Sequence, residues 1–256
     1  MSNDTALVIN PARNYVEGLR LPEIPAPRAP VEPLQFKPGT DEAFVVGSQI
    51  NAFTPSVANE IRADVTNCTL LAQLAASKKV GSTSAIYDWY NAYFEVLFNV
   101  GWTLTENNFD IYQTSNVDME VHEAILAVAE VFLGAAPAAL AIVKSVIGAL
   151  AKMDEGSPWI TLFNHQSQKI NNAAFQIAVT DQSESGELAI SLMAFGIESE
   201  KTATQVLFFK FGEASATLRK CAGRVTMNEQ VLRTVRENIA KKVISFTSDF
   251  VRNIQV

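Results

Sequence analysis

Cysteine and histidine are scarce in this chain. The 256 residues include two cysteines, Cys68 and Cys221, and two histidines, His122 and His165. Cysteines so far apart have no metal-ligand spacing, and two of them do not make a disulfide framework in a chain of this length. The sequence therefore predicts no structural metal site and no disulfide-based fold.

Recognisable catalytic motifs are also missing. The sequence has no phosphate-binding G-x-x-x-x-G-K-[ST] loop, no G-x-G-x-x-G after a strand and no serine in a nucleophile elbow. His122-Glu123 starts like a zinc-protease helix, but Leu126 stands where the second histidine is needed. His165 lies in a polar segment, which favours a surface position over a general base. We therefore expect a non-enzymatic protein without a dissociable cofactor.

Charged residues make up only 18% of the chain, against 48% apolar residues. Such a composition excludes wholesale disorder and allows a large core. The charge is unevenly distributed along the chain. Residues 1–200 hold 10 basic and 23 acidic residues, whereas residues 201–256 hold 10 basic and 4 acidic residues. The basic end either pairs with the acidic remainder or faces an anionic partner, with Arg219, Lys220 and Arg224 as candidate contacts. The net charge of −7 argues against a nucleic-acid partner.

The N-terminal region is rich in proline. Seven of the ten prolines lie between Pro11 and Pro38, and proline disfavours both helices and inner strands. We expect residues 1–40 to form an extended arm, strapped across the domain or a neighbouring subunit by its apolar residues Leu19, Leu21, Ile24, Val31, Leu34 and Phe36. Residues 1–10 show no basic stretch followed by an apolar one, so we expect no signal peptide. A cytoplasmic location in the producing cell follows, with release by a signal-independent route if the protein acts at membranes.

Residues 41–256 read as a single α+β domain. Three- and four-residue apolar spacing predicts helices over 54–75 and 84–99, with Thr54 as a cap, and a final helix that starts at a Thr226/Glu229 capping box. A short helix is expected after Pro158. Strands are predicted near 175–179, 188–197 and 205–211, with a weaker one over 102–113. The predicted fold is an antiparallel meander of about residues 174–220, plus one or two earlier strands, covered by helices on both faces.

The apolar run 124–151 is the most distinctive segment. Only Glu130 and Lys144 interrupt it, and Gly134 and Pro137 divide it into two helices of about 15 residues, too short to cross a hydrocarbon core of about 30 Å. The hairpin is either a packed core element or a surface that contacts lipid or a partner. The candidate contact residues are Leu126, Val131, Phe132, Leu133, Leu140, Val143 and Ile147.

Cys221 is the candidate modification site. It lies among Arg219, Lys220 and Arg224, just ahead of the final helix, and both features predict a lowered thiol pKa. The alternative is a small apolar residue at a strand–helix junction. Cys68 falls on an apolar helical stripe and is the weaker candidate. S-acylation would need a second membrane signal, which the 124–151 hairpin or the basic residues supply.

An α+β chain of this size without a signal peptide or catalytic motif, with Cys221 between basic residues before a terminal helix, resembles the Evf-type virulence factors of insect-gut bacteria. The resemblance covers about residues 87–256. It implies a non-enzymatic protein whose function depends on palmitate held as a thioester on a cysteine, here Cys221 or Cys68.

The leading interpretation is a lipid- or membrane-associated, toxin-like virulence factor with a membrane or fatty acid as its partner. The alternative is a soluble homo-oligomeric interaction module whose arm is exchanged between subunits. A carrier or enzyme with an apolar pocket is a third interpretation.

Overall fold

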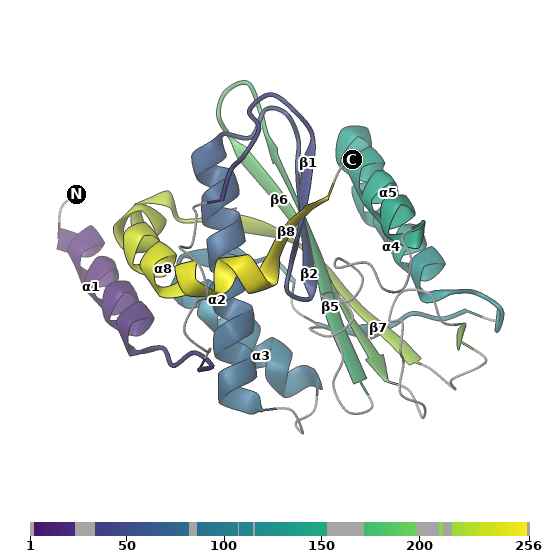
Figure 1. Cartoon of the computed structure of the whole chain (residues 1–256), viewed down its shortest axis with the longest axis horizontal. Coiled ribbons are helices and arrows are strands. Elements are labelled where there is room, and N and C mark those ends of the chain that lie inside the picture. Colours follow the sequence, from purple (N-terminus) through teal and green to yellow (C-terminus); the bar gives the residue numbers. More distant parts are fainter. Residues whose placement is uncertain are drawn as a thin grey trace.

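A mixed eight-stranded sheet forms the centre of the molecule, with helices on both faces (Figure 1). The structure is a computed structural model, and it describes residues 3–23, 34–81, 86–106, 108–114, 116–152, 172–198, 210–211 and 217–254. In chain order the strands are β1 Glu42–Val46, β2 Gln49–Phe53, β3 Trp102–Leu104, β4 Asp110–Ile111, β5 Asn172–Gln182, β6 Leu188–Glu198, β7 Thr217–Met227 and β8 Val251–Ile254. Their order across the sheet is β3-β7-β6-β5-β2-β1-β8, and β4 also pairs with β7. The pair β2–β5 is parallel, and the other pairs are antiparallel.

The helices form two covers. One cover, which we call the α2 layer, consists of α1 Asn3–Gly18, α2 Asn59–Val80, α3 Ile86–Asn99 and α8 Glu229–Phe250, with α1 outermost against α8 (Figure 1). The other cover is the α4–α5 hairpin, made of α4 Val121–Leu133 and α5 Pro137–Ala151.

Strand β6 shows why both covers are needed. Ile190, Leu192 and Ala194 belong to the core under the α2 layer. Met193, Phe195 and Ile197 belong to the core under the α4–α5 hairpin. Because successive side chains of a strand point to opposite faces, this apolar run requires protein on both sides. The predicted α+β class with helices on both faces is thus confirmed.

Arg62 is the strongest polar link between the α2 layer and the rest of the chain. It is fully buried, and its Nη1 contacts Glu42 Oε2 of β1 at 2.6 Å. Its other donors reach the carbonyl oxygens of Val57, Thr40 and Thr54 at 2.9–3.0 Å. A buried charge is tolerated only when it is paired and hydrogen-bonded in this way.

Gln73 supplies a second link between α2 and the sheet. Its Oε1 accepts from the backbone amide of Ser48 at 2.8 Å, and its Nε2 donates to Val46 O at 2.8 Å. Both partners belong to the β1–β2 turn, where Gly47 has φ +57° and would place a side chain 2.6 Å from Gln73 Oε1. Glycine therefore suits the backbone angle of this turn, and a side chain here would displace the Gln73 amide from its hydrogen bonds.

Two tyrosines of α3 bind the centre of the sheet. The buried Tyr90 hydroxyl donates to Phe195 O at 2.7 Å and accepts from Gln176 Nε2 at 2.9 Å. The Tyr93 hydroxyl donates to Gln49 Oε1 at 2.6 Å. The α2 layer is therefore held on the sheet by buried hydrogen bonds as well as by apolar packing.

The N-terminal region differs from the predicted extended arm. Residues 3–18 form a helix that includes Pro11, and Ala12 and Val16 are buried in the core. The expectation that this part would not be helical was wrong, because its other prolines all follow Gly18 and burial favours the helix. The strapping contacts were expected correctly where they are described, since Leu19, Leu21, Leu34 and Phe36 pack against the core. Ile24 and Val31 lie outside the described residues.

Several predicted boundaries also shift. Helix α2 begins at Asn59 rather than beside Thr54, whose hydroxyl donates to Asp181 Oδ1 at 2.6 Å. Asn228 caps α8 instead of Thr226, because its side chain accepts from the first amides of the helix. The predicted strand 102–113 is split into β3 and β4, β7 extends beyond the predicted limit of residue 220, and β1, β2 and β8 were not located in advance. The short helix expected after Pro158, His165 and residues 205–209 lie outside the described residues.

Candidate functional site

The α4–α5 hairpin begins and turns where its sequence favours it. Glu120 and Glu123 form a reciprocal capping box at the start of α4, with Glu120 N donating to Glu123 Oε2 at 2.8 Å. Pro137 occupies the first turn of α5, where proline has no amide to lose. The predicted division of the apolar run into two helices is confirmed.

The inner face of the hairpin is apolar and fully buried against the sheet. Its residues are Val121, Ala124, Ile125, Val128, Ala129, Leu133, Ala139, Ile142, Val143, Val146, Ile147 and Leu150. They meet inward-facing residues of the central strands, among them Phe175, Ile177 and Val179 of β5. This face resembles an ordinary protein core.

The outer face of the hairpin differs from an ordinary solvent face. Val131 of α4 is 89% exposed, and the exposed residues of α5 include the small Ala138 and Ala141. The charges Glu130 and Lys144 neutralise one another in an ion pair of 2.7 Å that joins the two helices. The exposed residues of the hairpin also include Glu123 and Ser145, so its outer face carries few charges for a surface helix but is not wholly apolar.

The hairpin is attached to the sheet by packing. Within the described part of the chain, no hydrogen bond or ion pair joins a side chain of α5, or of α4 from Glu123 onward, to a strand. No described helix is both long enough and apolar enough to span a bilayer. The attachment is therefore non-directional, unlike that of the α2 layer.

A groove of about 500 Å³ opens where α4 meets the edge of the sheet. One wall is apolar and comes from α4, namely Ala127, Val128, Val131 and Phe132. The other wall comes from β4, β7 and the residues on either side of β4, namely Glu106, Asn108, Asp110, Tyr112, Lys220, Cys221 and Ala222. The volume lies within the usual range of small-molecule sites, about 300–1,000 Å³.

Cys221 lies in the middle of β7 and not at a strand–helix junction. It is 3% exposed, and its Sγ lies 3.5 Å from the carbonyl oxygen of Glu106, as the thiol donates to that oxygen. Burial, with the nearby Glu106 and Asp110, raises the pKa of the thiol to about 11, and Lys220 opposes this only in part. The predicted lowering of the pKa was wrong, because burial and carboxylates outweigh the basic neighbours in sequence.

Cys68 occupies the environment that its apolar stripe predicts. It is 1% exposed within α2, and burial raises its thiol pKa far above the usual range. Both cysteines are free thiols. The described residues contain no group of three or more histidine, cysteine, aspartate or glutamate side chains placed to hold a metal ion.

The three candidate basic contacts do not form one patch. Arg219 lies beside Glu198, at 3.6 Å, and over the ring of Tyr87 on the α3 side. Lys220 follows it in the same strand and points to the opposite face. Arg224 is exposed further along β7, opposite Ser191 of β6. Strand geometry separates residues that are adjacent in sequence.

The predicted contact residues of the hairpin divide between its faces. Leu133, Val143 and Ile147 are buried against the sheet. Leu126, Phe132 and Leu140 are half-buried at its margins, and only Val131 is fully exposed.

Sequence reasoning missed the polar wall of the groove. Glu106, Asn108 and Asp110 come together with Cys221 because β4 pairs with β7, where Asp110 is opposite Lys220. The two segments are more than a hundred residues apart in the chain. The only local signal was the weak alternation over 102–113, which does not identify a partner strand.

No protein-family model and no curated protein matches this sequence. Solved structures do match. A structure described as a delta-endotoxin is 16% identical, with a TM-score of 0.39, over 80% of this chain and 90% of that one. Activated Cyt2Ba from Bacillus thuringiensis subsp. israelensis is 15% identical, with a TM-score of 0.40, over 70% of this chain and 97% of that one. The Evf virulence factor is 11% identical, with a TM-score of 0.34, over 93% of this chain and 90% of that one.

The last of these represents the family that the sequence resembles. The chain is thus distantly similar in fold to an endotoxin, to activated Cyt2Ba and to a virulence factor. The function proposed below rests on this chain's own residues.

Proposed function

We propose that this protein is a non-enzymatic, toxin-like factor that binds lipid membranes through the α4–α5 hairpin. One observation carries the proposal: the hairpin leaves the large apolar side chain of Val131 exposed beside a mutually neutralised ion pair, and no described hydrogen bond or ion pair ties a side chain of α5, or of α4 from Glu123 onward, to a strand. Lipid tails can replace apolar packing without leaving a hydrogen bond unmade.

The lengths of the helices favour a position in the membrane interface. With 13 and 15 residues, α4 and α5 are about 20 and 22 Å long, below the roughly 30 Å of a hydrocarbon core. Glu130 and Lys144 lie on the outer face as an ion pair, so the pair adds no net charge to the surface that enters the interface. The hairpin therefore lies on the bilayer with its apolar residues in the acyl boundary.

Release of the hairpin uncovers the sheet. Phe175, Ile177 and Val179 of β5 and Met193 and Phe195 of β6 then lose their cover. An apolar surface of this kind is stable only against lipid or another copy of the chain. Membrane binding is thus coupled to assembly of several copies.

The test is flotation of the full chain with phospholipid vesicles, together with dye release. Val131→Glu adds a charge at a fully exposed site, so it leaves the fold intact and weakens flotation by about tenfold or more, because charge is costly in the acyl region. Ile244→Glu in α8 is the matched control, since Ile244 is 40% exposed on the other cover and should not change flotation.

Equal flotation of the two variants would contradict the proposal. A stable oligomer by light scattering that does not bind vesicles of any composition would favour the soluble interaction module instead.

We also infer that Cys221 is the acylation site. The observation that favours it is the groove, because Cys221 of β7 lines it together with the apolar residues of α4. The thiol itself points into the core under the α2 layer and donates to Glu106 O. The thiol sulfur attacks the carbonyl carbon of an acyl thioester donor. A C–S bond to Cys221 forms as the C–S bond of the donor breaks. The donor leaves as a free thiol, which takes the proton from the Cys221 thiol.

Intact mass of protein from its native producer, before and after hydroxylamine, tests this site. We expect hydroxylamine to remove a fatty-acid mass from the wild type and from Cys68→Ser. Cys221→Ser should carry no such mass before treatment. A labile adduct that persists in Cys221→Ser would refute the assignment.

The raised pKa gives an independent check. Because the folded thiol ionises near pH 11 rather than near 9, iodoacetamide at pH 8 should alkylate folded Cys221 at least about 100-fold more slowly than unfolded Cys221. Fast alkylation of the folded chain would show that the thiol is not buried as described.

A further inference from the structure

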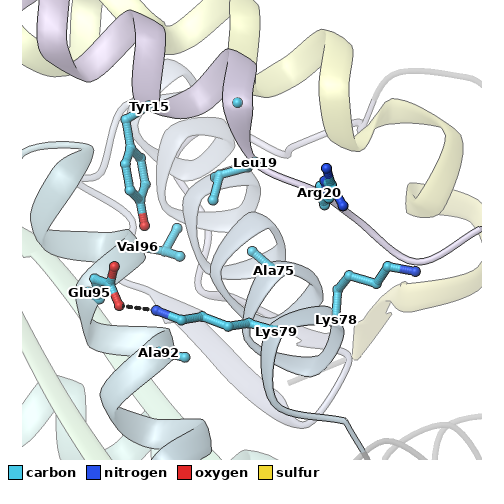
Figure 2. Close-up of a pocket in the computed structure, with 10 residues that line it drawn as sticks. Tyr15, Leu19, Arg20, Ala75, Lys78, Lys79, Ala92, Glu95 and Val96 are labelled. Atoms are coloured by element: carbon cyan, nitrogen blue, oxygen red, sulfur yellow. Dashed lines mark hydrogen bonds and ion pairs between the residues drawn. The ribbon is translucent and has the colours of Figure 1, made fainter.

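A separate pocket lies in the α2 layer, away from the hairpin. It measures about 330 Å³ and is formed where the end of α1 crosses α2 and α3 (Figure 2). Its lining residues are Tyr15, Gly18, Leu19, Arg20, Ala75, Lys78, Lys79, Ala92, Glu95 and Val96. Neither the groove beside Cys221 nor the α4–α5 hairpin contributes to it.

The pocket has an apolar middle and a charged rim. Leu19, Ala75 and Val96 lie between the two ends of the pocket (Figure 2). At one end, Lys79 Nζ contacts Glu95 Oε2 at 2.6 Å, and the Tyr15 hydroxyl points toward Glu95. Burial and Glu95 raise the pKa of Tyr15 to about 12, so its hydroxyl remains a hydrogen-bond donor at neutral pH.

The other end of the pocket carries uncompensated positive charge. Arg20 and Lys78 lie on the same side, away from the Lys79–Glu95 pair (Figure 2). In the portion of the chain that the structure describes, neither has an ion-pair partner. Two cations beside an apolar pocket stand out in a chain with a net charge of −7, and they attract an anionic group.

We propose that this pocket binds a soluble single-chain anionic amphiphile, with its anionic head at Arg20 and Lys78 and its alkyl chain over Leu19, Ala75 and Val96. An apolar cavity with a few placed charges is the usual form of such a site. The head binds by charge, and the chain displaces water from the apolar middle.

Ligand binding would also fix α1. The helix is tied to α8 by Glu17, whose Oε1 accepts from Asn238 Nδ2 and whose carbonyl oxygen accepts from Lys242 Nζ, both at 3.0 Å. A ligand under the end of α1 adds contacts to α2 and α3. Amide exchange in α1 should therefore slow when the ligand binds.

Calorimetric titration of the full chain with sodium decanoate, below its micelle concentration, tests the proposal. Binding at one site is expected. Acetate, which has the head alone, and decyltrimethylammonium, which has the chain with the opposite charge, should each bind at least about tenfold more weakly. This test uses no membrane and does not depend on the hairpin.

Two variants place the ligand in this pocket. Arg20→Glu/Lys78→Glu should weaken decanoate binding by about tenfold or more, and Leu19→Trp should do the same by filling the apolar middle. Arg233→Glu/Lys241→Glu is the matched control, because it makes the same charge change at exposed positions of α8. Thermal unfolding checks that each variant folds.

Equal binding of the cationic and anionic amphiphiles would overturn the proposal. So would decanoate binding that the double variant and Leu19→Trp both leave unchanged, or acetate binding as tightly as decanoate.

Discussion

The two covers of the sheet both bury apolar residues but are attached by different chemistry. The α2 layer adds buried hydrogen bonds and ion pairs, such as Arg62 with Glu42 and Gln73 with the β1–β2 turn. The α4–α5 hairpin uses packing. Directional bonds are lost when their partners separate, whereas apolar packing can be exchanged for any apolar surroundings. In the function proposed above, the hairpin is therefore the cover that leaves the sheet, and the α2 layer is the cover that stays.

The largest effect on stability is expected for the polar contacts of the α2 layer. Arg62→Met leaves the carboxylate of Glu42 buried without its cation, and we expect a loss of about 3–5 kcal/mol in the free energy of unfolding. Urea denaturation measures it. Adding Glu42→Gln to Arg62→Met should restore part of the lost stability. If Arg62→Met alone stayed within about 1 kcal/mol of the wild type, Arg62 would not be an important link between α2 and the sheet.

A smaller loss is expected at Gln73. Gln73→Leu leaves the amide of Ser48 and the carbonyl of Val46 without their side-chain partner, which costs about 1–3 kcal/mol. The same denaturation series measures the change. If α2 were held by packing alone, as the hairpin is, the variant would be neutral.

In the α4–α5 hairpin, we expect Ile147→Val to lower stability by a smaller amount and to affect the hairpin alone. Removing one buried methylene costs about 0.5–1.5 kcal/mol. Hydrogen exchange should show faster opening of α4 and α5 and unchanged protection of α2 and α8, because the hairpin opens as a separate unit. Acceleration spread evenly over both covers would contradict the idea that they open separately.

The smallest change in stability is expected on the outer face of the hairpin. Glu130→Gln/Lys144→Gln removes an exposed ion pair and should change stability by less than about 1 kcal/mol. Vesicle flotation should increase, because two charges no longer enter the interface. Unchanged or reduced flotation would indicate that the outer face does not meet lipid.

Local sequence patterns predicted the hairpin, α3 and α8 because each has its own apolar spacing and stop signals. They failed where distant contacts decide the structure. Pro11 lies inside α1 because Ala12 and Val16 are buried in the core. The five-residue strands β1 and β2 have no distinctive pattern and are set by their pairing with β8 and β5.

The candidate site was predicted in part for the same reason. The apolar hairpin was evident in the sequence, and Val131 lies exposed on it. The environment of Cys221 could not be predicted from the sequence, because Glu106 and Asp110 come near it only through the pairing of β4 with β7. Its neighbours in sequence are basic, and its neighbours in space include two carboxylates.

The position of β1 has a consequence for biosynthesis. It is flanked by β2, the next strand in the chain, and by β8, which follows α8 about two hundred residues later. During translation, its second edge therefore stays unpaired until residues 251–254 leave the ribosome. Such late closure is slow and exposes a strand edge to wrong partners, so a nascent chain of this protein is expected to need chaperone protection until β8 has been synthesised.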